Sequence, residues 1–340
     1  MGKYTFYILL ILLLSSCAKN KFKRSTFLQE LYDYKIAPEL LEAETAFGSF
    51  ENDWGTYISN TTSTNLTTAK VSFKEAITQM DRIQFYNLGE ISETYIYNKF
   101  NKGSIDTLEM WNFYSSTSTI TQNSVASLAN PQKGVYAVEY LLYSSFTMDS
   151  LTSLKYRNWI SAYINDVNEN LSTLRSSWGV YKKNFIENED DGVEGSFNII
   201  CNRIIHALED MIDKRLSPVL TSNDKTQGIG YRSESWLSGV KENVQQIYDV
   251  YIGNGIQKFN SVHVYLRKKN KKLAEEVLSD FESIISHQNS LTQSMDWYLQ
   301  NDIAAIEDYK QSLQELLITF KLDVSNAMGI VVTFGDTDGD

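Results

Sequence analysis

The sequence predicts an all-α protein made of two packed, four-helix-bundle-like domains. Only three prolines occur in 340 residues, at positions 38, 131 and 218, so long stretches lack the residue that breaks helices. Apolar residues recur at intervals of three and four along most of the chain, which is the period of an amphipathic helix. Strand-like alternation is confined to the tail "GIVVTF". These observations together predict packed helical bundles.

The first predicted bundle covers residues 27–190 and follows a short tether over 17–26, which includes the basic cluster "KNKFKR". The polar stretch "SNTTSTNLTTAK" at 59–70 predicts a loop. The acidic stretch "ENEDDGVEG" at 187–195 contains two glycines and predicts the domain boundary. The first predicted helix is interrupted: its apolar stripe is Phe27, Leu31, Tyr34 and Leu41, with Pro38 at a kink or at the start of a new helix. A second helix is predicted over 71–88, followed by short helical pieces within 101–131. Pro131 and Gly134 then open a further helical run, and a long helix is predicted over 149–186.

The second predicted bundle covers residues 191–340. Its first helix runs from Phe197 to Leu216 and is expected to stop at Pro218, before a loop over 221–230. The remaining predicted helices are one over 233–251, one through Leu273, Val277, Phe281 and Ile284, and one through Ile306, Tyr309, Leu313, Leu317, Phe320 and Val324.

The chain start predicts a lipoprotein signal peptide over residues 1–16. Lys3 precedes an apolar core that is too short for a stable membrane anchor, and the segment ends in Leu14-Ser15-Ser16-Cys17. A cysteine in this place resembles the lipobox of bacterial lipoproteins, so Cys17 is the predicted lipid-attachment residue. The alternative is an ordinary signal peptide that ends near a cysteine, but no A-x-A-like site is present. Ala18 follows, which by resemblance to Gram-negative lipoprotein sorting favours the outer membrane. We therefore expect a lipid-anchored protein of the cell envelope that faces the periplasm.

The net charge argues against two classes of partner, and the cysteine count argues against a disulfide. The whole chain carries a net charge of −11, and without its signal peptide it has 30 basic and 42 acidic residues, a net of −12. This argues against nucleic acid as a partner, because such binding depends on neutralising phosphates. It also argues against an electrostatic grip on anionic lipid.

Once Cys17 is lipidated only Cys201 remains, so no intramolecular disulfide is expected. The apolar neighbours of Cys201 predict a buried, inert thiol.

Six segments, in order, carry a family resemblance: "IAPEL" at 36–40, "FKEAITQMDRIQFYNLGEI" at 73–91, "KGVYAVEYLL" at 133–142, "YRNWISAYINDVNENLSTLRSSW" at 156–178, "SESWLSGVKENVQQIYDVYIGN" at 233–254 and the ending "TFGDTDGD". Together they resemble the imelysin family, formerly grouped as peptidase M75, over nearly all of the mature chain. The resemblance implies two packed four-helix bundles. It also implies a role in an envelope system for iron uptake, with other iron-uptake proteins of the envelope as partners.

The family motif Gly-x-His-x-x-Glu falls on the third of these segments. Its His and Glu stand three residues apart, which places both on one helix face. Here Gly134 and Glu139 are present, but Tyr136 takes the place of the histidine. Tyr136 and Glu139 could hold iron or another divalent or trivalent metal, with further carboxylates from other helices. Alternatively, Glu139 is a buried anchor that forms hydrogen bonds between the bundles, or it faces solvent.

Catalysis is not expected. Neither an H-E-x-x-H nor a G-x-S-x-G sequence occurs, and the three histidines, His206, His263 and His287, lie outside the motif. The ending "DTDGD" lacks the spacing of an EF-hand calcium loop and predicts only an acidic chain end. The expected function is therefore binding in iron or metal acquisition. The alternatives are a metallopeptidase of the old M75 type, and a structural or protein-interaction lipoprotein that has lost the metal site.

Overall fold

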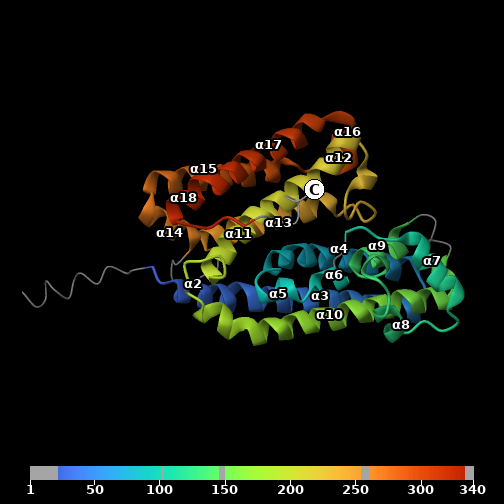
Figure 1. The fold of residues 1–340 in the computed structure, drawn as a ribbon. Coiled ribbons are helices and arrows are strands. Elements are labelled where there is room, and N and C mark those ends of the chain that lie inside the picture. Colours follow the sequence, from blue (N-terminus) through green and yellow to red (C-terminus); the bar gives the residue numbers. More distant parts are fainter. Residues whose placement is uncertain (1–21, 101–102, 145–149, 254–260, 334–340) are drawn as a thin grey trace, which may run out of the picture.

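The two bundles lie side by side and pack along their lengths (Figure 1). The structure, a computed structural model, describes residues 22–100, 103–144, 150–253 and 261–333. Within these ranges the chain forms helices and no strand, which confirms the predicted fold class. None of the helices in the described ranges combines the length and the apolar character needed to cross a bilayer.

The first bundle is built from three long helices and the shorter α2. A π-helical turn over Tyr32–Ile36 joins α2 to the next helix, so the interrupted stripe in the sequence is one nearly continuous helical stretch. The elements are α2 (Arg24–Leu31), α3 (Ala37–Ser59), α4 (Ser63–Ile83), α5 (Glu90–Glu93), α6 (Ile96–Phe100), α7 (Thr107–Ser116), α8 (Gln122–Ala126), α9 (Val135–Tyr143) and α10 (Leu154–Glu187).

The second bundle begins after the acidic loop that follows α10. Its long helices are α11, α13, α15 and α17, and α13 packs on α4 of the first bundle. The elements are α11 (Ser196–Glu209), a π-helical turn over Asp210–Leu216, α12 (Ser217–Ser222), α13 (Trp236–Ile252), α14 (Val262–Lys269), α15 (Lys271–Ser290), α16 (Met295–Asn301), α17 (Ile303–Thr319), a π-helical turn over Phe320–Val324, and α18 (Ser325–Met328).

Two predicted helix boundaries are wrong. The expected loop at 59–70 is mostly helix, because Thr62 caps α4 by accepting a hydrogen bond from the Asn65 N–H and the polar residues that follow form its exposed face. The expected stop at Pro218 is also wrong. The proline lies in the first turn of α12, where a missing N–H costs nothing, so the helical path continues past it.

Aromatic side chains dominate the interior. The fully buried residues include four tryptophans, and the buried hydrophobic residues form one continuous core through both bundles. In the described part of the chain this core runs from Phe27 to Met328. A chain that starts at Ala18 therefore keeps every one of these core side chains, and we expect it to fold without the predicted signal peptide and Cys17.

Candidate functional site

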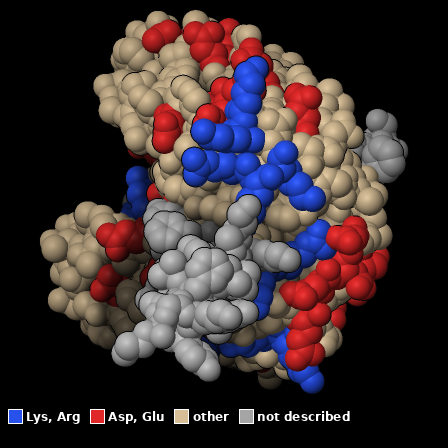
Figure 2. All heavy atoms as spheres, turned by 90° about the vertical axis from the view of Figure 1, so that its left-hand side faces the viewer, with Lys and Arg blue, Asp and Glu red and all other residues tan. Residues whose placement is uncertain are grey.

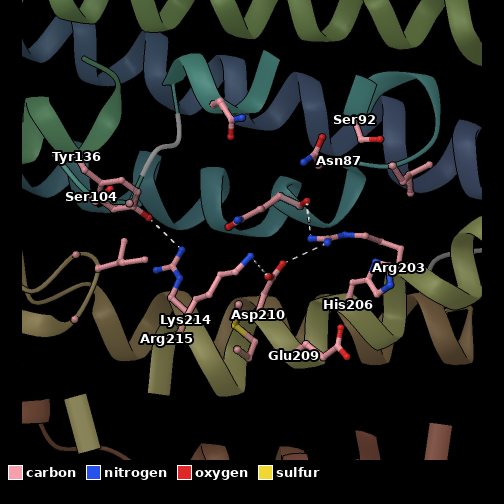
Figure 3. Close-up of a pocket in the computed structure, with 18 of the residues that line it drawn as sticks. Asn87, Ser92, Ser104, Tyr136, Arg203, His206, Glu209, Asp210, Lys214 and Arg215 are labelled. Carbon is pink, nitrogen blue, oxygen red and sulfur yellow. Dashed lines mark hydrogen bonds and ion pairs between the residues drawn. The ribbon is translucent and has the colours of Figure 1, made fainter. Parts of the chain in front are cut away.

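A polar cleft of about 1100 Å³ lies between the two bundles. One wall is formed by the segment after α4 and by the start of α9, and the other by α11 with its π-helical turn. The loop 226–232 closes one end. Figure 3 shows Arg203, His206, Asp210 and Lys214 on the α11 side of this space. The family motif residues Tyr136 and Glu139 both line the cleft.

Tyr136 is held by a buried ion pair that joins the bundles. Nη2 of Arg215 lies 2.5 Å from Oδ1 of Asp81, and both side chains are almost fully buried. The Tyr136 hydroxyl donates to the same Asp81 oxygen at 3.1 Å. It also accepts from Arg215 Nη2 at 3.2 Å, a contact drawn in Figure 3. Asp81 comes from α4, Tyr136 from α9, and Arg215 from the turn after α11. The Arg215 guanidinium therefore places a positive charge directly beside the Tyr136 hydroxyl.

Two glycines make this arrangement fit. Gly134 has a φ of +91° and begins α9, and a Cβ there would lie 2.7 Å from the backbone oxygen of Phe100. Gly239 on α13 faces Asp81, and a Cβ there would lie 3.0 Å from Asp81 Cγ and closer still to Oδ2. Gly134 thus lets the start of α9 approach the backbone of Phe100, and Gly239 leaves room for the buried ion pair itself.

The surroundings keep Tyr136 in its neutral form. Burial raises the pKa of the Tyr136 phenol well above its ordinary value of 10.0, and the nearby charge of Arg215 only partly opposes this. Tyr136 would have to lose its proton to bind a metal as a phenolate. Both the high ordinary pKa of a phenol and the burial of this side chain oppose that loss. The neutral hydroxyl serves instead as donor and acceptor in the buried ion pair.

Glu139 links α9 to the loop that precedes α13. Its Oε1 accepts hydrogen bonds from the backbone N–H of Ser233 at 2.7 Å and from the Ser233 hydroxyl at 2.6 Å. The side chain is only 1% exposed, so the alternative of a solvent-facing Glu139 is wrong. Burial raises the pKa of Glu139 above its ordinary 4.5, and the hydrogen bonds from Ser233 oppose the shift. This geometry favours the interpretation of Glu139 as a buried anchor between the bundles.

The two motif oxygens do not fit a bare metal ion as they stand. The Tyr136 hydroxyl is engaged by Asp81 and Arg215, and Glu139 is engaged by Ser233. In the described ranges, no group of three or more His, Cys, Asp or Glu side chains is arranged to hold a metal. An ion that binds to both motif residues would have to displace the Arg215 guanidinium. The role of Tyr136 and Glu139 as metal ligands remains a prediction.

A second buried network joins the bundles further along α13. Lys35 lies 2.9 Å from Glu39 and 3.2 Å from Asp249, and Arg82 lies 3.3 and 3.1 Å from the same two carboxylates. Glu39 also accepts from the Tyr86 hydroxyl at 2.5 Å. Because every charge here has an opposite partner, the network fixes how α3, α4 and α13 pack. Sequence reasoning missed it, and the only signal was that Lys35 and Glu39 stand one helical turn apart.

The C-terminal segment lies along one rim of the cleft. Asn198, Asn202 and His206 stand four residues apart on α11 and bind the extended backbone of 331–333. His206 Nε2 lies 3.0 Å from the Thr333 carbonyl oxygen. The strand-like pattern at the tail thus produces an extended segment bound to side chains of a helix. The sequence "DTDGD" lies outside the described residues, as do residues 1–16 and the first half of the tether, residues 17–21 with Cys17.

The other histidines and the cysteine have structural surroundings. His263 Nδ1 lies 3.2 Å from the Tyr251 hydroxyl, and the His287 ring packs edge-on against Tyr309. Cys201 is buried, and burial raises the pKa of its thiol well above the ordinary value of 9.0. Such a thiol is inert, as the sequence predicts, because the reactive thiolate is strongly disfavoured.

Several polar groups on the cleft wall are open to a ligand. The Arg232 guanidinium lies over the rings of Tyr140 and Tyr231, at 5.0 and 4.4 Å. No carboxylate of the described chain lies at ion-pair distance from it, but its charge acts on the buried Glu139 carboxyl and opposes the rise in the pKa of that group. Lys214 is exposed beside Asp210, at 2.8 Å. Oε1 of Gln84 and Oδ1 of Asn87 are buried acceptors that have no hydrogen-bond donor among the described residues. The cleft thus offers cations for carboxylates and acceptors for hydroxyl groups.

Comparisons with known proteins place these features in context. The family model for imelysin (peptidase M75) matches residues 37–319. A structure from Parabacteroides distasonis, described as an iron-regulated protein A precursor, is similar with a TM-score of 0.77 and 12% identity over 92% of this chain and 97% of that one. An imelysin-like protein from Psychrobacter arcticum gives a TM-score of 0.76 and 11% identity over the same shares of the two chains. At such identities the likeness concerns the fold alone. A search of curated proteins gives no match.

Proposed function

The chain belongs to the imelysin family, and from this premise we propose that it is a non-catalytic binding protein of an iron acquisition system. In this proposal the cleft between the bundles takes up iron as a complex with an oxygen-rich organic chelator. One of the similar structures is described as an iron-regulated protein A precursor, which supports an iron-related role. The predicted lipid anchor at Cys17 would hold the protein at the outer membrane, facing the periplasm, where such complexes arrive.

The observation that carries the proposal is the position of Arg215. Its guanidinium already binds the Asp81 carboxylate and the Tyr136 hydroxyl, so the oxygens of these two side chains would bind a second cation only weakly. Iron that arrives with its coordination sphere filled by a chelator avoids this competition. The cleft, at about 1100 Å³, is also far larger than a single ion requires.

The groups on the cleft wall suit a hydroxycarboxylate chelator. Arg232 can form paired hydrogen bonds to a carboxylate, and the rings of Tyr140 and Tyr231 hold its guanidinium in place. Lys214 adds a second cation that can turn from Asp210 to a ligand. The unpartnered oxygens of Gln84 and Asn87 can accept from a chelator hydroxyl. Citrate, which carries both carboxylates and a hydroxyl, is the simplest probe of this chemistry.

Calorimetric titration of the chain from Ala18 tests the proposal. The titrants are ferric citrate, citrate alone, ferrous iron and zinc. We expect ferric citrate to bind and Arg232→Gln to weaken it by about 10- to 100-fold, the effect of losing one hydrogen bond to a charged group. Lys183→Gln, an exposed change on the outer face of α10, is the control and should leave binding unchanged.

Two outcomes would overturn the proposal. If ferric citrate does not bind at all, the cleft is not a site for this class of complex. If ferrous iron or zinc binds tightly and Glu139→Ala abolishes binding while the fold persists, then Glu139 is a direct metal ligand and the chelator plays no part. The unchanged melting temperature of each variant would show that the fold persists.

A further inference from the structure

A strongly basic face lies at one end of the second bundle. The last turn of α14 and the first turn of α15 form it, with the side chains of Arg267, Lys268, Lys269, Lys271 and Lys272. All five are exposed, and Figure 2 shows Lys and Arg side chains gathered on this end of the molecule. We call these five residues the basic face.

The charges of the basic face are only partly neutralised. Lys271 and Lys272 each pair with a glutamate one turn further along α15, at 3.5 and 3.1 Å. Exposed pairs of this kind contribute little and leave the cations accessible to other partners. Within the described part of the chain, Arg267 and Lys269 have no carboxylate at ion-pair distance. The face therefore presents a local excess of positive charge in a chain whose net charge is −11.

The described chain begins against the same end of the molecule. The ring of Phe22 packs on Tyr265 of α14 with centroids 4.9 Å apart, and Lys268 Nζ lies 5.8 Å from the centre of the Phe22 ring. Figure 1 shows α2 and α14 at one end of the two bundles. Cys17 precedes Phe22 by five residues. Because an extended chain spans at most about 3.5 Å per residue, a lipid on Cys17 would hold Phe22 within about 17 Å of the membrane surface.

We propose that the basic face docks on anionic lipid headgroups and so fixes the orientation of the bundles on the membrane. The predicted lipid anchor at Cys17 would bring the basic face close to a membrane. Binding of the face to anionic headgroups depends only on its own charges. The total charge of the chain does not oppose it, because charges beyond a Debye length of about 10 Å are largely screened. In the acidic loop after α10, Asp191 is paired with Arg24 at 2.5 Å. In this proposal, the expectation that acidity argues against an electrostatic grip on anionic lipid does not apply to this end of the molecule.

Vesicle flotation with the chain from Ala18 tests the docking without the lipid anchor. The vesicles contain phosphatidylcholine mixed with phosphatidylglycerol, or phosphatidylcholine alone, at an ionic strength of about 0.1 M, where the Debye length is about 10 Å. We expect binding to the anionic vesicles only, and release by added salt. The triple variant Arg267→Gln, Lys268→Gln and Lys269→Gln should bind about 100-fold more weakly, because each basic side chain near an anionic surface contributes roughly fivefold.

A control variant separates the position of the charges from their number. Lys74→Gln, Lys99→Gln and Lys310→Gln remove the same three charges from α4, α6 and α17, away from the basic face, and should retain binding within a few fold. Equal binding of the wild-type chain to neutral and anionic vesicles would overturn the proposal. So would an equal loss in both triple variants, because total charge alone would then control binding. Melting temperatures of both variants verify that they are folded.

Discussion

Gly239→Ala tests how closely the bundles are joined around Asp81. A Cβ at this position would lie 3.0 Å from Asp81 Cγ and closer still to Oδ2, so the carboxylate would have to move. Asp81 is 1% exposed and holds both Arg215 and the Tyr136 hydroxyl. Moving it leaves a buried guanidinium without its partner, and breaking a buried pair in this way costs about 3–5 kcal/mol.

The substitution also has a favourable effect, which must be subtracted. Replacing glycine by alanine within a helix stabilises it by about 1 kcal/mol. The expected net result is a loss of about 2–4 kcal/mol in the free energy of unfolding, measured by urea denaturation with an unchanged dependence on urea concentration. Gly179→Ala on α10 is the matched control, because a Cβ there meets nothing within 4 Å, and it should stabilise by about 0.4–1 kcal/mol. If both variants gained stability alike, the Asp81 contact would not constrain α13 and the reasoning would fail.

Three further predictions concern the cleft. Burial raises the pKa of Glu139 above 4.5, so the folded protein binds the proton of the Glu139 carboxyl more tightly than the unfolded chain does. As the pH rises from about 4.5 towards neutral, ionisation of Glu139 therefore lowers the free energy of unfolding. The stability of Glu139→Gln relative to the wild type should therefore increase over that range in urea unfolding, and a difference independent of pH would contradict this. Tyr136→Phe should cost about 1.5–3 kcal/mol in the same assay, since it removes hydrogen bonds to charged groups, and should leave ferric citrate affinity unchanged. Lost iron binding would instead support the metal-ligand prediction. Asn202→Ala removes the donor to the Val331 carbonyl and the acceptor for the Thr333 amide, so hydrogen exchange at Thr333 should accelerate by about tenfold, whereas unchanged exchange would show that the segment is held elsewhere.

The long helices were predictable because their signal is local. Apolar periodicity and the scarcity of proline predict α10 and α13 to within about five residues of their observed ends, and the two later apolar stripes lie in α15 and along α17 with the π-helical turn that follows it. The errors came where local signals were ambiguous. Runs of Ser, Thr and Asn occur both in loops and on exposed helix faces, and a proline fits the first turn of a helix as well as the end of one.

The site was predictable only in part. The motif around Gly134 identified Tyr136 and Glu139, and the structure places both at the cleft. Their partners Asp81, Arg215 and Ser233 come from other elements 55 to 94 residues away along the chain. No spacing rule connects positions so far apart. The one available signal was a charged residue at an apolar helix position, such as Asp81 beside Met80 and Ile83, because a buried charge requires a partner.

The central claim is that iron enters the cleft as a chelate while Arg215 keeps its place beside Tyr136. Anomalous diffraction at the iron edge, from crystals soaked in ferric citrate, tests this most directly. We expect the iron peak in the cleft near Arg232 and Lys214, with citrate oxygens around it and the contacts among Asp81, Tyr136 and Arg215 intact. Iron bonded directly to the oxygens of Tyr136 and Glu139, with the Arg215 guanidinium displaced, would contradict the account.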